Sequence, residues 1–508
     1  MTGTWAAPAR RKASLVERER FCLLNQTHAL SDRGWDDEAL DKLWRYHLHY
    51  FDDLNAEGAD SRTPWHRELI ERWVRENPPA AGSGWEPYPT SLRIVNWIKW
   101  ALAGNALPQV CADSLAAQAR WLSRRLEIHL LGNHLFANAK ALLFAGVYFD
   151  GREAQGWQDK ALLILAREIP EQILGDGGHF ERSTMYHALA LEDMLDLCNV
   201  VAAYPNAAAP GRADEIRHWR EQVGPMRAWL AAMCHPDGEI AFFNDAALGI
   251  APARVELEDY ASRLAFLPLA APAGPVIALG ESGYVRVDLD AAVALLDVAP
   301  VGPDYLPGHA HADTLSFELS VFGQRVFVNS GTSCYGGGAE RLRQRGTAAH
   351  NTVVVDGKDS SEVWGGFRVA RRARPLGLEI AVDDAIEVRC AHDGYARPRR
   401  EQEHRRQWRF GDCELVVEDT VTGDFDRAQA RFHLHPAIAV PADGAHAGGA
   451  VLQIAGQRDI EVRVEGGVMR IEPSTWHPEF GRSIASLCLV VDFTAAPLRT
   501  RIDWKHRP

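Results

Sequence analysis

Apolar side chains recur with helical spacing through the first half of the chain, from about Asp36 to about His235. Residues three and four apart on a helix share one face, so this spacing predicts amphipathic helices separated by Gly, Pro and Asn. The expected helices are Asp37–Leu54, Trp65–Arg75, Thr90–Ala103, Ala112–Glu127, Leu135–Phe149, Gln158–Leu174, Arg182–Ala203 and Asp214–Met233. No convincing strand pattern interrupts them, which predicts an all-α half.

The period changes to two beyond the Pro- and Gly-rich stretch between Leu269 and Tyr284, which indicates a domain boundary. Successive residues of a strand face opposite sides of a sheet, so short alternating runs with Gly and Asp turns predict an antiparallel β-sandwich. The expected strands are Tyr284–Asp288, Leu315–Val321, Val326–Val328, Thr352–Val355, Glu414–Val417, Glu461–Val464 and Cys488–Val491. We therefore predict an α+β chain of two domains, an all-α domain over residues 1–275 with an N-terminal extension and a β-sandwich over residues 276–508.

Composition is that of an ordinary globular protein, because 46% of the residues are hydrophobic and 24% are charged. The 508 residues exceed what one hydrophobic core usually serves, which agrees with two domains. The net charge of -13 argues against a nucleic-acid partner. It leaves room for a locally basic cleft, because salt screens charges beyond roughly 8 Å, so an anionic substrate stays compatible with the sequence.

The 8 cysteines are scattered without a C-x-x-C pair, and we expect reduced, mostly buried thiols. Near the N-terminus a basic stretch, Arg10–Lys12, is followed by Glu17–Arg20 without an apolar core, so no signal peptide is expected. No later run approaches the roughly 20 apolar residues of a membrane helix. A cytoplasmic protein without membrane insertion is the default expectation, with a periplasmic or secreted location left open and the oligomeric state not indicated.

The segment Pro307–Val321 joins a glycine, two histidines and an aspartate to an alternating apolar run. If the strand begins at the histidines, then His309, His311 and Asp313 project to one side. A single histidine at a strand end is usually just solvated, whereas three such groups on one face predict a site.

Three more segments combine polar groups in patterns typical of sites. In Gly132–Lys140 an Asn-His pair begins a helix, although a helix cap beside a satisfied histidine is the plainer interpretation. In Gly175–His187 a glycine turn begins a helix, whose N-terminus favours negative charge. The third segment runs from Val328–Thr332 to Arg345–Thr352 and adds a histidine entering a strand.

Taken together, these motifs resemble those of the heparinase II/III family of polysaccharide lyases. They are Gly132–His134, Asp176–Glu181 with Tyr186, His309–Asp313 and His350–Gly357. The resemblance runs from about Trp44 to about Trp364, with the motifs in family order. It implies an incomplete (α/α) toroid followed by an antiparallel β-sandwich, which agrees with the pattern of helices and strands.

The resemblance also implies β-elimination at a uronic acid, in which the C5 proton is removed and the O4-linked sugar departs. By similarity, Asn133 and His134 would bind the carboxylate and stabilise the charge that develops on it. Tyr186 would be the general acid, and for one uronate epimer also the base, whereas His134 or His309 would be the base for the other epimer. Arg182, one helical turn before Tyr186, could lower the pKa of that tyrosine, or could equally face solvent.

Zinc or a similar divalent metal with a structural role is the implied cofactor, and the matching ligands are His311, Asn329 and His350. Asn329 stands where relatives often carry aspartate and is a neutral, poorer ligand. If His309 faces substrate while His311 faces the metal, the backbone between them must be curved or bulged.

An anionic polysaccharide is the expected partner. Arg93, Lys99 and Lys140 are proposed as part of a basic lining, with solvation of those helices as an equal alternative. The residues expected to bind substrate are Arg93, Asn138, Lys140, His179, Glu181, His187 and Tyr305.

Two other functions stay open: a non-catalytic sugar-binding or assembly protein of exopolysaccharide synthesis, and a uronate C5-epimerase. Only elimination creates a conjugated double bond, so ultraviolet absorbance separates the lyase from both. Glycosaminoglycan-like, alginate-like and bacterial exopolysaccharide chains all carry uronates, and the sequence does not choose among them.

Overall fold

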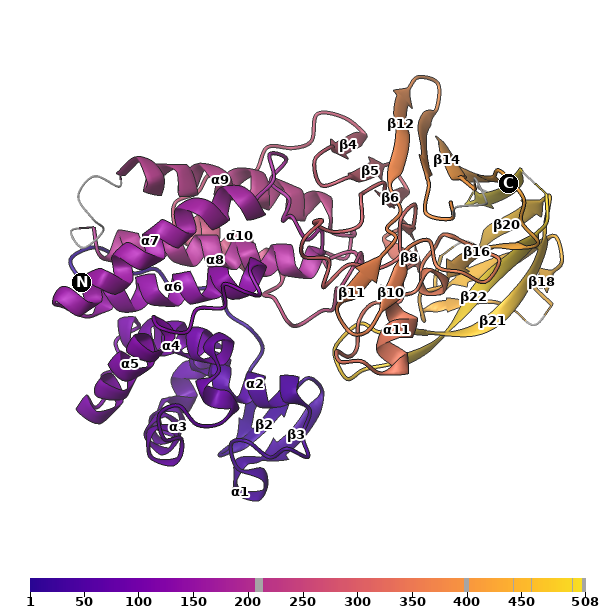
Figure 1. Cartoon of the computed structure of the whole chain (residues 1–508). Coiled ribbons are helices and arrows are strands. Elements are labelled where there is room, and N and C mark those ends of the chain that lie inside the picture. The colour runs from indigo at the N-terminus through magenta and orange to yellow at the C-terminus, as the bar shows by residue number, and fades with distance from the viewer. Residues whose placement is uncertain (206–212, 397–401, 442, 458, 496, 505–508) are drawn as a thin grey trace. The chain divides into compact units, whose positions relative to one another are not determined.

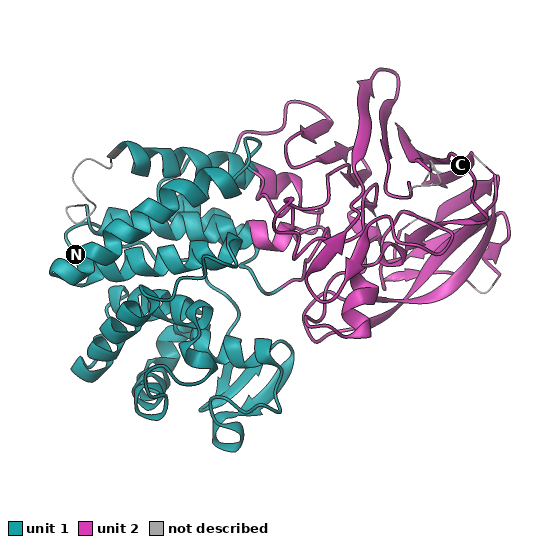
Figure 2. Cartoon of the chain, viewed as in Figure 1, with its two compact units in different colours: residues 1–177, 188–228, 249–269 teal, residues 178–187, 229–248, 270–508 magenta. Residues whose placement is uncertain are grey.

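The computed structural model describes residues 1–205, 213–396, 402–441, 443–457, 459–495 and 497–504 (Figure 1). The chain forms two compact units, each built from more than one stretch of sequence (Figure 2). The first comprises residues 1–177, 188–228 and 249–269, and the second comprises residues 178–187, 229–248 and 270–508. The boundary therefore differs from a single cut at residue 275, because two short internal stretches pack with the strands.

The first unit is helical apart from a small sheet near the N-terminus. Its helices are α1 (Leu30–Arg33), α2 (Lys42–Tyr50), α3 (Thr63–Glu76), α4 (Pro87–Leu102), α5 (Gln109–Leu122), α6 (Gly132–Tyr148), α7 (Arg152–Gln172), most of α8 (Thr184–Ala203), most of α9 (Ala213–Ala232), and α10 (Arg254–Arg263). Short 3-10 turns lie at Asp52–Asn55, Ala59–Arg62 and Ser83–Trp85. Within the described ranges, every helix is too short or too polar to span a lipid bilayer.

Local chemistry explains where several of these helices begin. The side chain of Asp41 accepts a hydrogen bond from the Leu43 N–H at the start of α2. Helix α4 begins with Pro87 and α3 has Pro64 as its second residue, and proline lacks the N–H that would have no helical partner in a first turn. Small residues let the buried helix α6 lie close to α7. A Cβ on Gly146 would come within 2.8 Å of the Gln158 backbone nitrogen.

Three features of this unit differ from the sequence prediction. The expected helix Asp37–Leu54 is shorter, because Phe51 adopts a φ of 62° and ends α2. Strands β1 (Leu15–Glu17), β2 (Arg20–Leu23) and β3 (Gln26–Ala29) form an antiparallel sheet that the all-α prediction missed. Helix α10 was also missed, because its polar composition gives a weak apolar stripe.

The second unit is built from antiparallel sheets, as predicted. A five-stranded sheet runs through β4 (Val276–Leu279), β5 (Tyr284–Asp288), β6 (Ala292–Asp297), β7 (Phe317–Val321) and β8 (Gln324–Phe327). A four-stranded sheet has the order β21 (Val468–Trp476), β22 (Ile484–Phe493), β16 (Ala428–His433) and β9 (Val353–Val355).

The largest sheet has nine strands, and the described part of the unit also contains a separate hairpin, one further helix and a 3-10 turn at Thr347–Ala349. The nine are β12 (Pro375–Val382), β13 (Ile386–His392), β14 (His404–Gly411), β15 (Glu414–Val421), β23 (Leu498–Asp503), β20 (Ile460–Glu465), β19 (Gly449–Ile454), β17 (Ile438–Ala439) and β18 (Ala445–His446). The hairpin pairs β10 (Glu362–Trp364) with β11 (Arg368–Ala370), and the helix is α11 (Ala339–Arg345).

One hydrophobic core joins these sheets. Strand β15 alternates between buried and half-buried positions, so one of its faces meets side chains of the neighbouring sheets. Leu415, Trp408, Phe432, Leu319 and Leu489 are fully buried in this core. The predicted fold class, a helical toroid followed by an antiparallel β-sandwich, is confirmed.

Candidate active site

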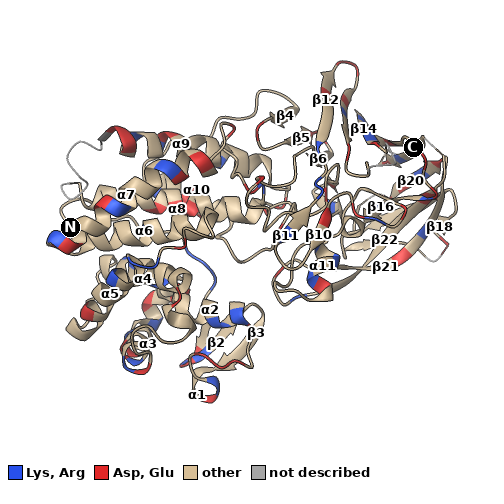
Figure 3. Ribbon diagram, in the orientation of Figure 1, with Lys and Arg blue, Asp and Glu red and all other residues tan. Residues whose placement is uncertain are grey.

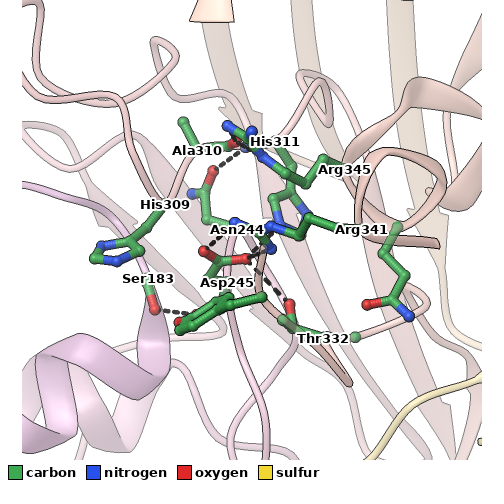
Figure 4. A network of polar contacts seen from close by, with 12 residues as sticks. Ser183, Asn244, Asp245, His309, Ala310, His311, Thr332, Arg341 and Arg345 are labelled. Atoms are coloured by element: carbon green, nitrogen blue, oxygen red, sulfur yellow. Dashed lines mark hydrogen bonds and ion pairs between the residues drawn. The ribbon is translucent and has the colours of Figure 1, made fainter. Parts of the chain in front are cut away.

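The two histidines of the His309–Asp313 segment lie in a loop that precedes β7, and not in the strand predicted there. Backbone contacts with residues 244 and 245 fix this loop. The Asp245 N–H donates to the His309 carbonyl at 2.9 Å, and the His311 N–H donates to Asn244 Oδ1 at 3.0 Å. As a result the side chains of His309 and His311 point in different directions (Figure 4). The expected divergence is present, and an irregular loop produces it.

His309 lies between a carboxylate and a tyrosine. Its Nδ1 contacts Glu181 Oε2, and its ring stacks on the ring of Tyr186 with centroids 3.9 Å apart and 18° between the planes. Ionised Glu181 can only accept, so Nδ1 carries the proton and Nε2 keeps a lone pair. The histidine is therefore oriented as a base.

The hydroxyl of Tyr186 lies 2.8 Å from the hydroxyl of Tyr335. Burial raises the pKa of Tyr335 well above its ordinary value, which keeps that phenol protonated and able to donate. Tyr186 belongs to the first turn of α8, where the Ser183 side chain accepts from the Tyr186 N–H at 3.1 Å. A serine cap thus fixes the backbone of the tyrosine.

The guanidinium of Arg182, which the sequence suggested as a cation for Tyr186, hydrogen-bonds two backbone carbonyls. Its Nε donates to the Ser282 carbonyl at 3.0 Å, and its Nη1 donates to the Phe180 carbonyl at 3.3 Å. A different guanidinium lies near the tyrosines: Arg341 Cζ is 4.9 Å from the centroid of the Tyr335 ring. Arg341 forms a two-pronged ion pair with Asp245, and this pair holds the Asp245 pKa well below its ordinary value although burial opposes it.

Asn133 and His134 lie at the start of α6 in the first unit, and both are half-buried. Asn133 hydrogen-bonds the hydroxyl of Tyr88, and the His134 ring packs on the Tyr88 ring at 4.4 Å. His134 Nδ1 lies 3.0 Å from Glu127 Oε1. Each side chain is therefore oriented by a neighbour and keeps part of its surface accessible.

Asn138 is fully buried and acts through its neighbours. Its Nδ2 donates to Glu127 Oε2 at 3.0 Å, and its Oδ1 accepts from the Glu127 N–H at 2.8 Å. Asn138 thus fixes the carboxylate that orients His134. This placement indicates a positioning residue and not a direct contact with substrate.

The three cations proposed as a basic lining lie inside the first unit. Arg93 is 0% exposed, Lys99 4% and Lys140 6%. Arg93 stacks on Trp73 at 3.8 Å, and Nε donates to Gln118 Oε1 at 2.9 Å. Basic and acidic residues occur along the same helices in the first unit (Figure 3). The positions of charged residues in the sequence therefore did not indicate which Lys and Arg side chains are exposed and which are buried.

Lys99 and Lys140 are paired with carboxylates of α8. Lys99 Nζ lies 2.5 Å from Asp196 Oδ2, and Lys140 Nζ lies 2.6 Å from Asp193 Oδ1 and also contacts Asp196. Burial opposes the charge on Lys140, but the two carboxylates outweigh it and raise the pKa of its amine. Both lysines therefore belong to a buried charge network and are not exposed as part of a basic lining.

Of the remaining predicted substrate contacts, only Tyr305 is well exposed, at 51%. Glu181 is buried, and its carboxylate contacts Nδ1 of His309. His179 and His187 are buried together: the His179 N–H donates to His187 Nδ1 at 3.2 Å, and burial lowers the pKa of His179 to about 4. The lowered pKa keeps the His179 ring neutral at pH 7.

His311, Asp313 and His350 form a buried group whose ligand atoms lie within 4.8 Å of one another. His311 Nδ1 and His350 Nε2 face each other at 3.1 Å. The aspartate in this group is Asp313, whereas the predicted ligand Asn329 has its polar atoms engaged elsewhere. Asn329 Nδ2 donates to the Phe242 carbonyl at 2.9 Å, and its Oδ1 accepts from the Asn351 N–H at 3.0 Å.

The tautomers of the two rings follow from their outer partners. His311 Nε2 lies 2.9 Å from Asp245 Oδ1, and His350 Nδ1 lies 2.9 Å from the Gly346 carbonyl. Both partners accept, so both outer nitrogens carry a proton and two lone pairs face each other. This arrangement suits a cation between them, because metal-bound histidines commonly donate their other N–H to a carboxylate or a carbonyl.

A second histidine pair in the same unit shows the contrasting arrangement. His404 Nδ1 lies 3.2 Å from His392 Nε2, and His404 Nε2 lies 2.7 Å from Asp419 Oδ1. Here the Gly394 N–H donates to His392 Nδ1 at 3.0 Å, so Nε2 carries the proton and donates to His404. This pair is satisfied without a cation.

Two family models match the chain in succession. The Heparinase II/III N-terminus matches residues 70–268, and the model described as Heparinase II/III-like, C-terminal, matches residues 271–505. The chain belongs to the heparinase II/III family.

The relatives that match this chain carry different names. A "Heparin-sulfate lyase" of Bacteroides stercoris is 28% identical over 259 residues, which are 46% of this chain and 38% of that protein. An "FtsZ-localized protein C" of Caulobacter vibrioides is 29% identical over 358 residues, which are 68% of this chain and 57% of that protein. The chain thus spans well under half the length of the lyase it matches.

A solved structure described as Heparinase III has a TM-score of 0.73 and 18% identity to this chain, over 92% of this chain and 78% of the other. This likeness shows a shared fold. Membership of the heparinase II/III family confirms the resemblance that four short motifs indicated.

Sequence reasoning missed three residues of the site, Asp245, Tyr335 and Arg341. Asn244-Asp245 follows the apolar run Ala241–Phe243, and a polar pair directly after a buried run was an available signal. Tyr335 lies in a Gly-rich loop without periodic pattern, and Arg341 lies in a short helix. Their partners are distant in sequence, so spacing could not reveal them.

Proposed function

We propose that this chain is a polysaccharide lyase that cleaves a uronic-acid-containing anionic polysaccharide by β-elimination. The observation that supports this most is the cluster of Glu181, His309, Tyr186 and Tyr335 in the second unit, which joins an oriented base to a pair of hydrogen-bonded phenols. The name of the heparin-sulfate lyase relative favours a sulfated glycosaminoglycan as substrate.

The reaction breaks the C5–H and C4–O4 bonds and forms the C4=C5 double bond. A base takes the C5 proton, and the electron pair of that bond becomes the new π bond as the C4–O4 pair leaves with oxygen. A general acid then supplies a proton to O4, so no oxidant or reductant is needed.

Tyr186 is the proposed acid. After Tyr186 has given up its proton, the Tyr335 O–H would donate to the Tyr186 oxygen and stabilise the phenolate. His309, with Nδ1 bound to Glu181, offers Nε2 as the base for one epimer, and Tyr186 serves as base for the other. Asn133 and His134 keep the role that the resemblance implies, hydrogen bonding to the uronate carboxylate as charge develops on it.

A structural divalent cation, with zinc as first candidate, is part of the proposal. His311 and His350 would hold it through the facing nitrogens, and the Asp313 carboxylate would supply the anion that Asn329 lacks. When bound, the ion would hold the 307–316 loop to the segment around His350. It takes no part in the proton transfers.

The decisive experiment measures ultraviolet absorbance of the conjugated uronate during incubation with heparan sulfate, chondroitin sulfate, hyaluronan and alginate. A rising signal with at least one polymer, absent in Tyr186→Phe, supports the lyase. A polymer that is bound or epimerised without any absorbance would replace this function with one of the alternatives.

A further inference from the structure

The hairpin of β10 and β11 places a large aromatic side chain in solvent. Its register pairs Glu362 with Ala370, Val363 with Val369 and Trp364 with Arg368. Val363 and Val369 pack on the cluster that includes Val301 and Ala310. Alternation along the strands therefore places Trp364 and Arg368 together on the opposite face, and Trp364 is 58% exposed.

The turn of this hairpin lies against the catalytic cluster. The Phe367 ring meets the His309 ring at 6.1 Å and the Tyr335 ring at 5.3 Å, both edge to face, and yet Phe367 is 43% exposed. Trp364 and Phe367 flank Gly365 and Gly366 at the turn. Two exposed aromatic side chains thus lie at this turn, and one of them, Phe367, meets His309.

A buried arginine fixes the position of the turn. Arg345 Nη1 donates to the carbonyls of Gly365 and Gly366 at 3.0 Å, and Nε and Nη2 donate to the Ala310 carbonyl at 3.1 and 2.8 Å. Among the described residues its hydrogen-bond partners are all backbone carbonyls, and it is 0% exposed. Burying a guanidinium without a carboxylate is costly. We infer that this cost is tolerated because Arg345 holds the turn of the hairpin and the loop of His309 and His311 in fixed positions relative to each other.

A second arginine and close backbone packing support the same position. Arg341 Nε donates to the Gly366 carbonyl at 3.1 Å. A Cβ on Gly366 would lie 2.4 Å from the Gly336 carbonyl oxygen, so the turn packs too closely for a side chain. Buried hydrogen bonds and close backbone packing therefore fix the position of this exposed hairpin.

The charge of the hairpin favours an anion. Arg371 pairs with Glu362 at 2.7 Å, and Arg372 pairs with Asp304 at 3.4 Å. Arg368 is exposed, and the structure shows no carboxylate partner for it in the described ranges. The face therefore combines one unneutralised cation with an aromatic ring directly across the hairpin.

The geometry points to a binding subsite on this hairpin for an anionic sugar residue of the same polymer, a neighbour of the residue that is cleaved. The apolar C–H face of a pyranose would pack on Trp364, and its carboxylate or sulfate would pair with Arg368. Phe367, at the turn of the same hairpin, contacts His309. The inference rests on the proposed function and adds a specificity element to it.

The test measures equilibrium binding of heparan sulfate and of hyaluronan by calorimetry, in the non-cleaving Tyr186→Phe background. Trp364→Ala and Arg368→Ala are each expected to weaken binding of one polymer about tenfold, which corresponds to roughly 1.4 kcal/mol. Trp364→Tyr should retain most of the affinity. Arg368→Ala should also flatten the dependence of affinity on salt.

Matched controls come from exposed side chains of the large sheet. Leu378→Ala on β12 and Arg405→Ala on β14 remove an exposed apolar group and an exposed cation elsewhere, and both should leave binding unchanged. Melting curves should show that all four alanine variants are folded.

The comparison of heparan sulfate with hyaluronan shows whether Arg368 pairs with a sulfate or with a carboxylate, because only heparan sulfate carries sulfate. Affinities of Trp364→Ala and Arg368→Ala within about twofold of the parent, like the controls, would overturn the subsite, as would a parent that binds neither polymer. Hairpin-dependent binding without any elimination by the unmodified chain would support the subsite and reject the lyase. A rate of elimination that is unchanged in Trp364→Ala and Arg368→Ala would support the lyase and reject the subsite.

Discussion

The hydroxyl of Tyr335 lies 2.8 Å from the hydroxyl of Tyr186, and burial keeps the pKa of Tyr335 above its ordinary value. Either hydroxyl can be the donor of this hydrogen bond. Because Tyr335 keeps its proton, it can donate to Tyr186 once Tyr186 has given up its own proton.

Tyr186→Phe is expected to lower turnover by about 10²- to 10⁴-fold, because the hydroxyl is the proposed general acid. Stacking on His309 needs only the ring and should persist, so melting temperature and polymer binding should change little. Initial rates by absorbance, together with calorimetric binding, check this. Activity near that of the parent would remove Tyr186 from the mechanism.

Tyr335→Phe should cost less, on the order of 10- to 100-fold in kcat, since it removes one hydrogen bond to a developing phenolate. Without that donor the pKa of Tyr186 rises, so the alkaline limb of the kcat–pH profile should move to higher pH. A profile of unchanged shape would mean that Tyr335 only packs against its neighbours.

Asn133→Ala and Asn138→Ala should separate a contact residue from a positioning residue. Asn133→Ala is expected to lower kcat more than it raises KM, because its hydrogen bond is proposed to strengthen as charge develops. Asn138→Ala leaves the buried Glu127 N–H and carboxylate short of partners and should lower the melting temperature as well, at a cost of about 1 to 3 kcal/mol. If Asn133→Ala changed KM alone, Asn133 would serve binding only.

The proposed metal site predicts different behaviour for two similar histidine pairs. His350→Ala should abolish bound zinc in elemental analysis and remove any effect of chelator on the melting temperature. His392→Ala, in the pair that is satisfied without a cation, should leave metal content unchanged. Equal metal content in the parent and in His350→Ala would contradict the site.

Asn329→Asp extends this test. A carboxylate oxygen in place of Nδ2 would face the Phe242 carbonyl, so we expect a lower melting temperature in the presence of chelator. Stabilisation by zinc in this variant beyond that in the parent would show that residue 329 reaches the ion.

Acid should destabilise the first unit before its carboxylates titrate. His49 is buried, its Nδ1 accepts from Trp73 Nε1 at 3.0 Å, and burial lowers the pKa of its ring to about 3. The unfolded chain binds a proton more readily than the folded one, so this contribution is fully present above about pH 6.5 and is lost as pH falls toward 3.

The expected loss is on the order of a few kcal/mol, measured as melting temperature between pH 7 and pH 4. His49→Asn keeps an acceptor for Trp73 and should flatten this slope, whereas His446→Asn, at an exposed position, should not. Parallel slopes for the parent and His49→Asn would assign the acid sensitivity to other groups.

Periodicity predicted most of the fold, because both units bury one face of regular elements. It failed at His309–Asp313, where alternation of His, Ala and Asp imitates a strand although backbone contacts with Asn244 and Asp245 shape an irregular loop. The short motifs identified Tyr186 and His309, whose rings stack on each other in the structure. Tyr335 could not be found, since nothing in its surroundings tells which distant residue it meets.

Charge patterns were the weakest guide. Arg93 and Lys140 were expected either in a basic lining or in solvent, yet both are buried against partners from other helices. The position of a cation in the sequence does not tell whether its side chain meets water or a partner inside the protein. Alternation had already placed Asp313 on the same side as His311, but only the loop geometry showed that Asp313, and not Asn329, lies beside the two histidines.

Asp196 on α8 is shared by Lys99, Lys140 and the hydroxyl of Tyr260. Replacing the aspartate alone would leave two buried amines without their common anion, and replacing one lysine would leave a carboxylate short of compensation. Divergence at these positions must therefore proceed by concerted changes. Homologues that lose the aspartate are expected to lose at least one lysine with it, so the cluster should be inherited as a block or be exchanged as a block for apolar residues.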